Sequence, residues 1–426
     1  MRTLILLRGL PCSGKTTWIK QNKLEDYTLS PDDLRTMMSS PILNADGTLS
    51  TNQGNNDRIM EIIYEMLETR MKQGASTIID VTHLGTESLK RYKKLCNKYG
   101  YGVIGVVDFT HVSYEECCRR NAERIPEHRR VPQHTMEWMK TVLEKSTFER
   151  KCFRRIDPRT AFRFDTPDLL FYGLQHIDFN KGFNEPPKKI YVFGDIHGCF
   201  DIFKQEFEKV YSPENVYIFC GDYLDRGDKN VETLKYVLDL HEKCITHTYF
   251  IEGNHESHLR NWSNGQPSYS RFFNENTAKE LNTFMSSKDR TRTKAFVRSL
   301  RPCMSFDFGE GKYFACHGGI SSPKQISNFT SASTFIKGSG KYEDGEKVCE
   351  TWKQNCEGRV QFFGHRVIGG DKEHCKVNDC VYALDGRVEI GDNLKYCEIL
   401  PTGEIVEHVV KNTFHKENSN TEISGV

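Results

Sequence analysis

Five short motifs in the second half of the sequence combine Asp, His and Asn with glycine. They are GDIHG at 194–198, GDYLDRG at 221–227, GNHE at 253–256, CHGG at 316–319 and GHR at 364–366. Carboxylate, imidazole and amide groups that share one aspartate can hold two divalent cations about 3.5–4 Å apart, which polarise a phosphoryl group and activate a bridging water. One histidine alone is more often structural than a ligand. Five motifs that each follow an apolar run predict a two-metal phosphoesterase centre.

A different phosphate chemistry is predicted near the N-terminus. The segment GLPCSGKT at 9–16 fits GxxxxGK[ST] and lies between a predicted strand, Thr3–Leu7, and a helix predicted from Lys15. Glycines let successive backbone N–H groups face a phosphate, and the helix N-terminus adds positive potential. Lys15 would reach the β- and γ-phosphates and the Thr16 hydroxyl would ligate Mg²⁺. We expect an ATP and Mg²⁺ site formed by Gly9, Ser13, Gly14, Lys15, Thr16 and Thr17.

The residues after this loop suggest an acceptor for the phosphoryl group. Asp32 and Arg35, in SPDDLR at 30–35, follow the point where a second strand is expected to end. A carboxylate there can take a proton from a hydroxyl, and an arginine can hold the acceptor's phosphate. A helix N-cap explains the same residues equally well. Asp80, at the end of the next apolar run, fits either magnesium or acceptor placement or a plain turn.

Two arginines further along could cover the triphosphate. Arg120 and Arg124 are four residues apart on a predicted helix and would share one face. Such a face can neutralise charge on the transferring group. A solvated basic helix is the alternative interpretation.

Strands alternating with helices must position these residues, which predicts α/β domains with parallel sheets. In the first half, strands are predicted at Ser76–Ile79 and Val103–Asp108 and a helix at Asp57–Lys72. In the second half, strands are predicted at Ile190–Phe193, Val216–Phe219, Tyr249–Ile251, Lys312–Cys316, Gln361–Phe363 and Val381–Leu384. We expect domains at 1–155 and 189–410, a Pro- and Arg-rich connecting region at 156–188, and a loose polar tail at 411–426.

Residues 1–155 resemble the kinase domain of the 5′-polynucleotide kinases of phage and bacterial end-healing enzymes. That family's phosphate loop, DDxR element, strand-end Asp, RNxxR lid and Val-Pro pair have counterparts at 9–16, 32–35, 80–83, 120–124 and 131–132. The resemblance implies that Asp32 is the general base for a 5′-OH. It also implies that Arg35 and Asp80 contact the acceptor and that Arg120 and Arg124 contact ATP. His83 stands where the family often has Asn.

Residues 189–400 resemble the calcineurin-like metallophosphoesterases, which implies an αββα sandwich, and their GDxHG, GDxxDRG and GNHE motifs are closest to the phosphoprotein-phosphatase branch. By this resemblance Asp195 and His197 bind the first metal and Asp222 bridges. Asn254, His317 and His365 would bind the second metal. His255 would be the general acid, held by Asp225, and Arg226 would bind the phosphate. Mn²⁺ is the expected metal, and Fe or Ni would also suit mixed oxygen and nitrogen ligands.

Together the two domains resemble the first two modules of bacterial kinase–phosphatase–ligase repair proteins. We expect a 5′-kinase and a 3′-phosphatase acting on RNA or DNA ends, with RNA favoured and 2′,3′-cyclic phosphate as a further substrate. The Lys-x-Asp-Gly motif of the ligase module does not occur in the sequence, which implies a separate ligase partner. The alternatives are a Ser/Thr-type protein phosphatase fused to a small-molecule P-loop kinase, and a nucleotide-gated binding module.

The composition fits a globular protein without a membrane anchor. The 426 residues are 37% hydrophobic and 27% charged, and no apolar run approaches the roughly 18 residues of a membrane span. Residues 1–155 hold 25 Lys and Arg against 19 Asp and Glu, a net charge of +6; the rest hold 34 against 39, a net charge of −5. The 15 scattered cysteines include no CxxC pair, which favours a reduced, cytoplasmic setting. The oligomeric state is left open.

Overall fold

The fold is taken from a computed structural model that describes residues 2–52, 54–84, 87–101, 103–146, 153–156, 176–181, 185–244, 247–325 and 330–415. The chain divides into two compact units. The first comprises Met1–Phe171 with Ser327–Ala332, and the second comprises Tyr172–Ile326 with Ser333–Val426. Each unit is described by itself. No helix in the described ranges combines the length and the apolar character that crossing a membrane requires.

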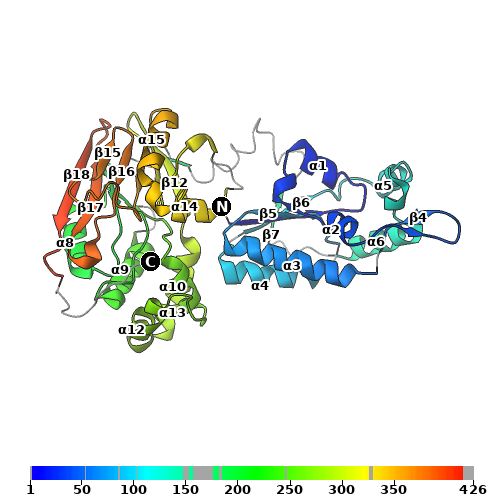
Figure 1. The fold of residues 1–426 in the computed structure, drawn as a ribbon, viewed down its shortest axis with the longest axis horizontal. Coiled ribbons are helices and arrows are strands. Elements are labelled where there is room, and N and C mark those ends of the chain that lie inside the picture. Colours follow the sequence, from blue (N-terminus) through cyan, green and yellow to red (C-terminus); the bar gives the residue numbers. More distant parts are fainter. Residues whose placement is uncertain are drawn as a thin grey trace. The chain divides into compact units, whose positions relative to one another are not determined.

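The first unit is built on a five-stranded parallel sheet with the strand order β2-β5-β1-β6-β7 (Figure 1). The strands are β1 (Thr3–Arg8), β2 (Thr28–Leu29), β5 (Thr77–Ile79), β6 (Val103–Asp108) and β7 (Phe153–Ile156). Leu4 and Leu6 of β1 pack into one core, whereas Ile5 and Leu7 pack into another on the opposite face. Because both faces of the sheet are covered, the central strand is apolar from Leu4 to Leu7.

Helices cover both faces of this sheet. They are α1 (Lys15–Gln21), α2 (Pro31–Met38), α3 (Asn56–Lys72), α4 (Glu87–Tyr99), α5 (Tyr114–Ala122) and α6 (Gln133–Lys145). In α3 the buried residues Ile59, Ile63, Leu67 and Met71 recur every four positions, and Ile63, Leu67 and Met71 pack into the core on one face of the sheet. A hairpin of β3 (Ile42–Leu43) and β4 (Leu49–Ser50) separates α2 from α3. A short 3₁₀ turn, η2 (Glu127–Arg129), separates α5 from α6.

The second unit contains two sheets that pack face to face. The first has the order β11-β10-β9-β17-β18 and the second has the order β15-β16-β14-β13-β12-β8. The strands of the first sheet are β9 (Ile190–Phe193), β10 (Val216–Phe219), β11 (Thr248–Phe250), β17 (Asn393–Ile399) and β18 (Ile405–Lys411). Those of the second are β8 (His176–Asp178), β12 (Cys303–Phe308), β13 (Gly311–Cys316), β14 (Arg359–Phe363), β15 (Lys376–Asn378) and β16 (Val381–Ala383).

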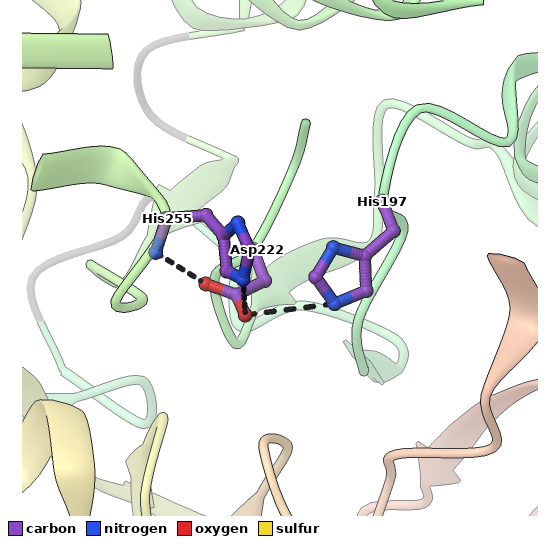
Figure 2. A group of neighbouring side chains, drawn as sticks. All are labelled: His197, Asp222 and His255. Carbon is purple, nitrogen blue, oxygen red and sulfur yellow. Dashed lines mark hydrogen bonds and ion pairs between the residues drawn. The ribbon is translucent and has the colours of Figure 1, made fainter. Parts of the chain in front are cut away.

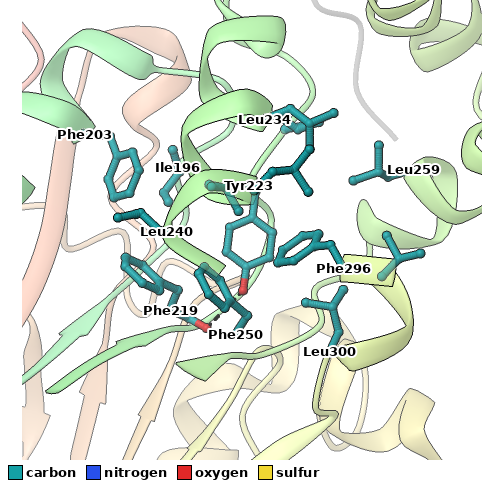
Figure 3. Close-up of a cluster of buried hydrophobic side chains, with 14 of the residues drawn as sticks. Ile196, Phe203, Phe219, Tyr223, Leu234, Leu240, Phe250, Leu259, Phe296 and Leu300 are labelled. Carbon is teal, nitrogen blue, oxygen red and sulfur yellow. Dashed lines mark hydrogen bonds between the residues drawn. The ribbon is translucent and has the colours of Figure 1, made fainter. Parts of the chain in front are cut away.

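Successive side chains along the strands of the second unit point alternately into two different hydrophobic cores. Ile190 and Val192 of β9 lie in the core between the two sheets, and Tyr191 and Phe193 lie in the core beneath the helices. Figure 3 shows part of this second cluster, where Phe219 of β10 lies near Phe203 and Phe250. The helices are α8 (Phe200–Val210), α9 (Asn230–Lys243), α10 (Glu256–Ser263), α11 (Arg271–Glu275), α12 (Thr277–Phe284), α13 (Ser287–Ser299), α14 (Ala332–Lys337) and α15 (Gly345–Asn355).

Near its ends the second unit has more regular structure than the sequence suggested. Within the connecting region expected at 156–188, β8 pairs with β12, and 157–175 and 182–184 lie outside the described residues. Strand β18 extends to Lys411, and the side chain of the buried Asn412 donates to the carbonyl of Val388 at 2.9 Å. The last part of the expected tail, 416–426, also lies outside the described residues.

Candidate active sites

The first site is the loop between β1 and α1. Gly9 and Gly14 have φ values of 151° and 101°, which side chains rarely allow. A Cβ on Gly9 would lie 2.8 Å from the Ser13 hydroxyl oxygen, so this loop curls too tightly for a side chain there. The Ser13 hydroxyl is buried and has no hydrogen-bond partner among the described residues. An unsatisfied donor inside such a loop fits a phosphate oxygen.

Lys15 and Thr16 stand at the end of this loop. The Lys15 ammonium is buried and donates to the carbonyl oxygens of Gly9 at 2.9 Å and Leu10 at 2.7 Å. Burial lowers its pKa, and Asp80 acts in the opposite direction. The Thr16 hydroxyl donates to Oδ2 of Asp80 at 3.0 Å, and burial raises the pKa of Asp80. A hydroxyl beside a carboxylate is a donor set suited to Mg²⁺.

Two cavities meet at these residues. One, of about 660 Å³, is lined by the phosphate loop with Thr17, Arg120 and Arg124, and by the rings of Trp18, Phe109 and His111. The other, of about 670 Å³, is lined by Asp32, Arg35, Asp80, Arg124, Arg129 and Arg130. Cys12, Lys15, Thr16 and Arg124 line both cavities. The loop therefore separates two spaces that could hold a phosphoryl donor and an acceptor.

The second of these cavities places Asp32 among arginines. Asp32 forms an ion pair with Arg35, and its Oδ2 lies 3.7 Å from Nη2 of Arg124. Arg129 has no ion-pair partner in the part of the chain that the structure describes, and its guanidinium lies 3.5 Å from the Thr36 hydroxyl. Ser30 occupies the N-cap position of α2, but its side chain makes no capping hydrogen bond.

The predicted shared helix face of Arg120 and Arg124 is wrong. Helix α5 ends at Ala122, so only Arg120 is helical, and Arg124 lies in the segment that leads to η2. Pro126, which the helix could not have continued through, is the sequence signal for this end. Both arginines still line the first cavity. Arg120 reaches the Cys12 carbonyl at 3.4 Å, and Arg124 donates to the Arg129 carbonyl at 2.7 Å.

His83, which follows Asp80, supports the turn after β5 from inside the fold. Its ring is buried, with Nδ1 2.7 Å from the carbonyl of Leu7 and 3.0 Å from that of Val81. Burial lowers the pKa of His83 to about 4. A neutral imidazole whose Nδ1–H donates to these carbonyls therefore joins the turn to the end of β1.

The second site lies at the carboxyl ends of strands from both sheets of the second unit. Asp195 and His197 follow β9, Asp222, Asp225 and Arg226 follow β10, and Asn254 and His255 follow β11. On the other sheet, His317 follows β13 and His365 follows β14. Parallel neighbours end at the same edge, so these motifs converge although they lie far apart in the sequence.

Several of these residues have left-handed backbone conformations. The residues with positive φ are His197, Asp222, Asp225, Arg226 and His365, with φ between 46° and 80°. Such conformations cost side-chain-bearing residues free energy and occur often at functional sites. The backbone also approaches the ligands closely, because a Cβ on Gly364 would lie 1.8 Å from Oδ1 of Asp195. The strand ends are therefore bent to turn these side chains inward.

Asp222 lies at the centre of the cluster. Its Oδ2 lies 3.6 Å from Nε2 of His197, 3.9 Å from Nε2 of His255 and 3.3 Å from Nε2 of His317. Figure 2 shows Asp222 between His197 and His255. Its Oδ1 accepts from the backbone N–H of His255 at 3.0 Å. One carboxylate thus contacts both halves of the cluster, as a bridging ligand must.

The remaining predicted ligands surround Asp222. Oδ1 of Asn254 lies 3.0 Å from Nε2 of His317, and Nδ1 of His317 lies 2.9 Å from the Cys220 carbonyl. The rings of His317 and His365 are 5.0 Å apart, and Asp195 accepts from the backbone N–H of His365. Ligand atoms of His197, Asp222 and His255, and separately of Asp222, His317 and His365, lie within 4.8 Å of one another. These oxygen and nitrogen donors fit divalent cations.

The electrostatics of the cluster are those of a site built for cations. Burial and the nearby Asp385 raise the pKa of Asp195. Burial opposes charge on His317, but Asp222 and Asp195 outweigh it and raise its pKa to about 10. Burial and His317 lower the pKa of His365 to about 3. Buried carboxylates crowded together in this way favour binding of positive charge.

His255 and Arg226 lie beside the cluster. Nδ1 of His255 donates to Oδ2 of Asp225 at 2.8 Å, which leaves Nε2 directed towards Asp222. Burial lowers the pKa of His255, but Asp222 and the hydrogen bond with Asp225 outweigh it, so the pKa is raised. The Arg226 side chain is half exposed and its Nη1 lies 3.2 Å from Oε1 of Glu389. An imidazole and a guanidinium thus lie beside the cluster.

The structure adds three carboxylates that motif reasoning missed. Glu256 accepts from the backbone N–H groups of Asp222, Tyr223 and Gly253 and so fixes the loop that carries Asp222. Asp385, after β16, is buried close to Asp195, and Glu389 holds Arg226. Glu256 lies inside the GNHE motif and could have been found there. Asp385 and Glu389 carry no motif signal that marks their contacts.

Family models match both units separately. Residues 4–146 match a model described as an AAA domain, and residues 188–369 match one described as a calcineurin-like phosphoesterase. The chain therefore joins a P-loop-type parallel-sheet domain to a calcineurin-like metallophosphoesterase domain, and the predicted fold class is confirmed.

Individual relatives also match only part of the chain. The serine/threonine-protein phosphatase PP2A-like PPG1 of Candida albicans is 31% identical over 46% of this chain and 45% of its own length. The asymmetrical bis(5′-nucleosyl)-tetraphosphatase PrpE of Bacillus velezensis is 28% identical over 42% of this chain and 77% of its own length. Among solved structures, a Saccharomyces cerevisiae protein serine/threonine phosphatase has 18% identity and a TM-score of 0.40, covering 59% of this chain and 88% of its own.

Proposed function

We propose that the chain prepares broken nucleic-acid ends for ligation, by phosphorylating 5′-OH ends with ATP and removing 3′-phosphates in a metal-dependent reaction. RNA ends are the favoured substrates, 2′,3′-cyclic phosphates a further one, and a separate ligase the expected partner. Each unit supplies one of the two activities. A kinase for one end and a phosphatase for the other together produce the 5′-phosphate and 3′-OH that sealing requires.

The arginine-lined cavity beside Asp32 is the observation that carries this proposal. A small acceptor without a phosphate needs a base for its hydroxyl but no cluster of positive charges. The cavity of about 670 Å³, in contrast, is lined by four arginines, Arg35, Arg124, Arg129 and Arg130. Several guanidinium groups in one cavity suit an acceptor that carries phosphates beyond its reacting hydroxyl. The 5′ end of a polynucleotide has this chemistry.

In the kinase reaction, Asp32 would accept the proton of the attacking 5′-OH. Lys15 and the arginines Arg120 and Arg124 would stabilise charge on the transferring phosphoryl group. Thr16 and Asp80 would hold Mg²⁺, which would supply charge that neutralises the phosphates. Arg35 would hold Asp32 in place, because the two side chains form an ion pair.

In the phosphatase reaction, Arg226 would bind the phosphate and His255 would protonate the leaving oxygen. Asp195, His197, Asp222, Asn254, His317 and His365 would hold two cations, with Mn²⁺ expected. When bound, the cations would polarise the phosphoryl group and lower the pKa of water at the site. Asp225 keeps the proton-donating Nε2 of His255 directed inward, because it engages Nδ1.

A doubly labelled oligonucleotide assay tests the proposal. RNA and DNA strands that carry a 5′-OH and a 3′-phosphate are incubated with ATP and Mg²⁺, with and without Mn²⁺, and both ends are scored. We expect γ-phosphate transfer to the 5′ end and Mn²⁺-dependent loss of the 3′-phosphate. Transfer only to a small metabolite, with both oligonucleotide ends unchanged, would refute it.

A matched pair of arginine variants tests the acceptor cavity. Arg129→Ala removes a guanidinium that lines the cavity and lacks an ion-pair partner within the described ranges. Arg119→Ala removes one that is exposed on α5 and paired with Glu116 and Glu123. We expect Arg129→Ala to raise the KM for an oligonucleotide acceptor about five- to tenfold, since a phosphate contact is lost, and Arg119→Ala to leave it unchanged. Equal effects would assign the basic lining no role in acceptor binding.

A second candidate function is favoured by the relatives of the second unit. PPG1 is named as a protein phosphatase and PrpE as a dinucleoside tetraphosphatase. On this alternative, the second unit acts on phosphoserine or on a dinucleoside polyphosphate, and the first unit phosphorylates a small molecule. Turnover of a phosphopeptide or a dinucleoside tetraphosphate far above that of an oligonucleotide 3′-phosphate would favour it.

A further inference from the structure

We propose that Thr277 and Glu280, on helix α12, are positioning residues for proton delivery to the leaving group, acting through Asp225 on His255. The proposal concerns the phosphoesterase reaction itself and is independent of whether the substrate is a nucleic acid. Neither residue belongs to a metal-binding motif. Helix α12 lies more than 50 residues beyond the loop that carries Asp225.

The first contact is direct. The Thr277 hydroxyl donates to Oδ1 of Asp225 at 2.5 Å, and Oδ2 of the same carboxylate accepts from Nδ1 of His255 at 2.8 Å. Thr277 is 1% exposed and Asp225 is also 1% exposed, so water does not compete for these bonds. With both oxygens engaged, the carboxylate cannot rotate away from the imidazole.

The second contact fixes the backbone of the same loop. Glu280, one turn along α12, accepts from the side-chain amide of Asn230 at 3.0 Å and from the backbone N–H of Val231 at 3.1 Å. The buried Asn230 in turn accepts from the backbone N–H of Asp225 at 2.8 Å. Asp225 has a φ of 80°, a conformation that needs such support.

Helix α12 is itself held firmly. Ala278 and Leu281 pack into the core beneath the first sheet, which also contains Leu234 of α9. The polar contacts of Thr277 and Glu280, together with the apolar face of α12, therefore fix this helix against the loop that carries Asp225. The hydrogen bonds from His255 and Thr277 outweigh burial and lower the pKa of Asp225, which keeps it ionised and able to orient the imidazole.

The chemical consequence depends on the leaving group. In phosphomonoester hydrolysis, the oxygen of water forms a bond to phosphorus and the bond from phosphorus to the ester oxygen breaks. His255 gives its Nε2 proton to that ester oxygen, and a proton from the attacking water restores the imidazolium. An alkoxide leaves poorly without this proton, whereas p-nitrophenolate leaves readily. Only the hydrolysis of alkyl phosphates therefore depends strongly on a well-placed general acid.

The experiment therefore compares two substrates, glycerol 2-phosphate and p-nitrophenyl phosphate, on the full chain with Mn²⁺. We expect Thr277→Val to lower kcat for glycerol 2-phosphate about tenfold and for p-nitrophenyl phosphate less than about twofold. Thr277→Ser, which keeps the hydroxyl, should restore both rates to within about twofold of the original. His255→Ala should show the same selectivity with a larger loss.

Two further variants complete the test. Glu280→Gln weakens the support that Asp225 receives through Asn230, and it should show the same selectivity. It tests the proposal even if Thr277→Val folds poorly. Thr283→Val changes an exposed threonine of the same helix that bonds only within it, at 2.8 Å to the Lys279 carbonyl, and should leave both rates unchanged. Equal losses on the two substrates in Thr277→Val and Glu280→Gln, or no recovery in Thr277→Ser, would overturn the proposal.

Discussion

The two candidate sites differ in the charges that they present to a phosphate. The site in the first unit supplies positive groups of its own, through Lys15, Arg120 and Arg124, on a short loop and two nearby segments. The site in the second unit supplies mainly carboxylates and imidazoles, collected from strand ends between Asp195 and Asp385. On the proposed function, the first site would hold a phosphate with its own positive groups, whereas the second would need bound cations to do so.

The two sites are also built in different ways. A contiguous loop needs only local backbone geometry, such as the φ of 101° at Gly14, to direct N–H groups at one point. A dispersed cluster needs the whole fold to be correct, because Asp222 follows a strand of one sheet and His317 follows a strand of the other. The second design gains a bridging carboxylate at the cost of strained backbone at five of its residues.

The largest effect is expected when the bridging carboxylate is removed. Asp222→Ala takes away the group that contacts both halves of the cluster, so phosphatase activity should fall on the order of 10³-fold or more. Kinase activity should stay unchanged, because the kinase residues all lie in the other unit. Steady-state assays of both activities check this, with Asp228→Ala, an exposed carboxylate of the same loop, as the control. Equal loss of both activities in a folded protein would contradict two independent sites.

Removing the buried ammonium of the first site is expected to have the next largest effect. Lys15→Ala should lower phosphoryl transfer about 10²- to 10³-fold, because a charge that stabilises the transferring group is lost. Hydrolysis of p-nitrophenyl phosphate should not change. Lys20→Ala, at an exposed position of the same helix, is the matched control. A comparable loss in Lys20→Ala would mean that general charge, rather than the loop, binds the phosphates.

A smaller effect is expected from the proposed base. Asp32→Asn keeps the shape of the side chain but cannot accept the proton, so kcat for the kinase should fall about 10²-fold while the KM for ATP stays the same. The neighbouring Asp33 is exposed and does not line the acceptor cavity, so Asp33→Asn should be close to wild type. If both variants lose activity equally, the role of Asp32 is that of a helix N-terminal charge.

The smallest effect concerns the stability of the first unit in acid. Burial holds the pKa of His83 at about 4, below its ordinary 6.5, so His83 contributes stability above pH 6.5 that is lost as the pH falls towards 4. The loss should approach about 3 kcal/mol. Hydrogen exchange of β1 and β5 between pH 7 and 4.5 measures it, and His83→Asn should flatten the dependence. An unchanged slope in that variant would assign the acid sensitivity to other groups.

Much of this architecture could be predicted from the sequence, because its motifs sit next to strands with clear apolar patterns. The phosphate loop and the strand-end motifs after β9 and β10 were found in this way, since strand, turn and ligand are adjacent in the chain. The end of α5 at Ala122 was missed although Pro126 signals it. The contacts of Glu389 and Thr277 could not be found, because each joins residues 163 or 52 positions apart with no pattern to mark them.

The division of the predicted metal ligands between two sheets has a mechanical consequence. Asp195, His197, Asp222 and Asn254 follow strands of one sheet, whereas His317 and His365 follow strands of the other. Cations bound by both groups would act as cross-links that close one edge of the sandwich. Because such ions bind only the folded form, their concentration would set how tightly the two layers hold together, while the first unit would not respond to it.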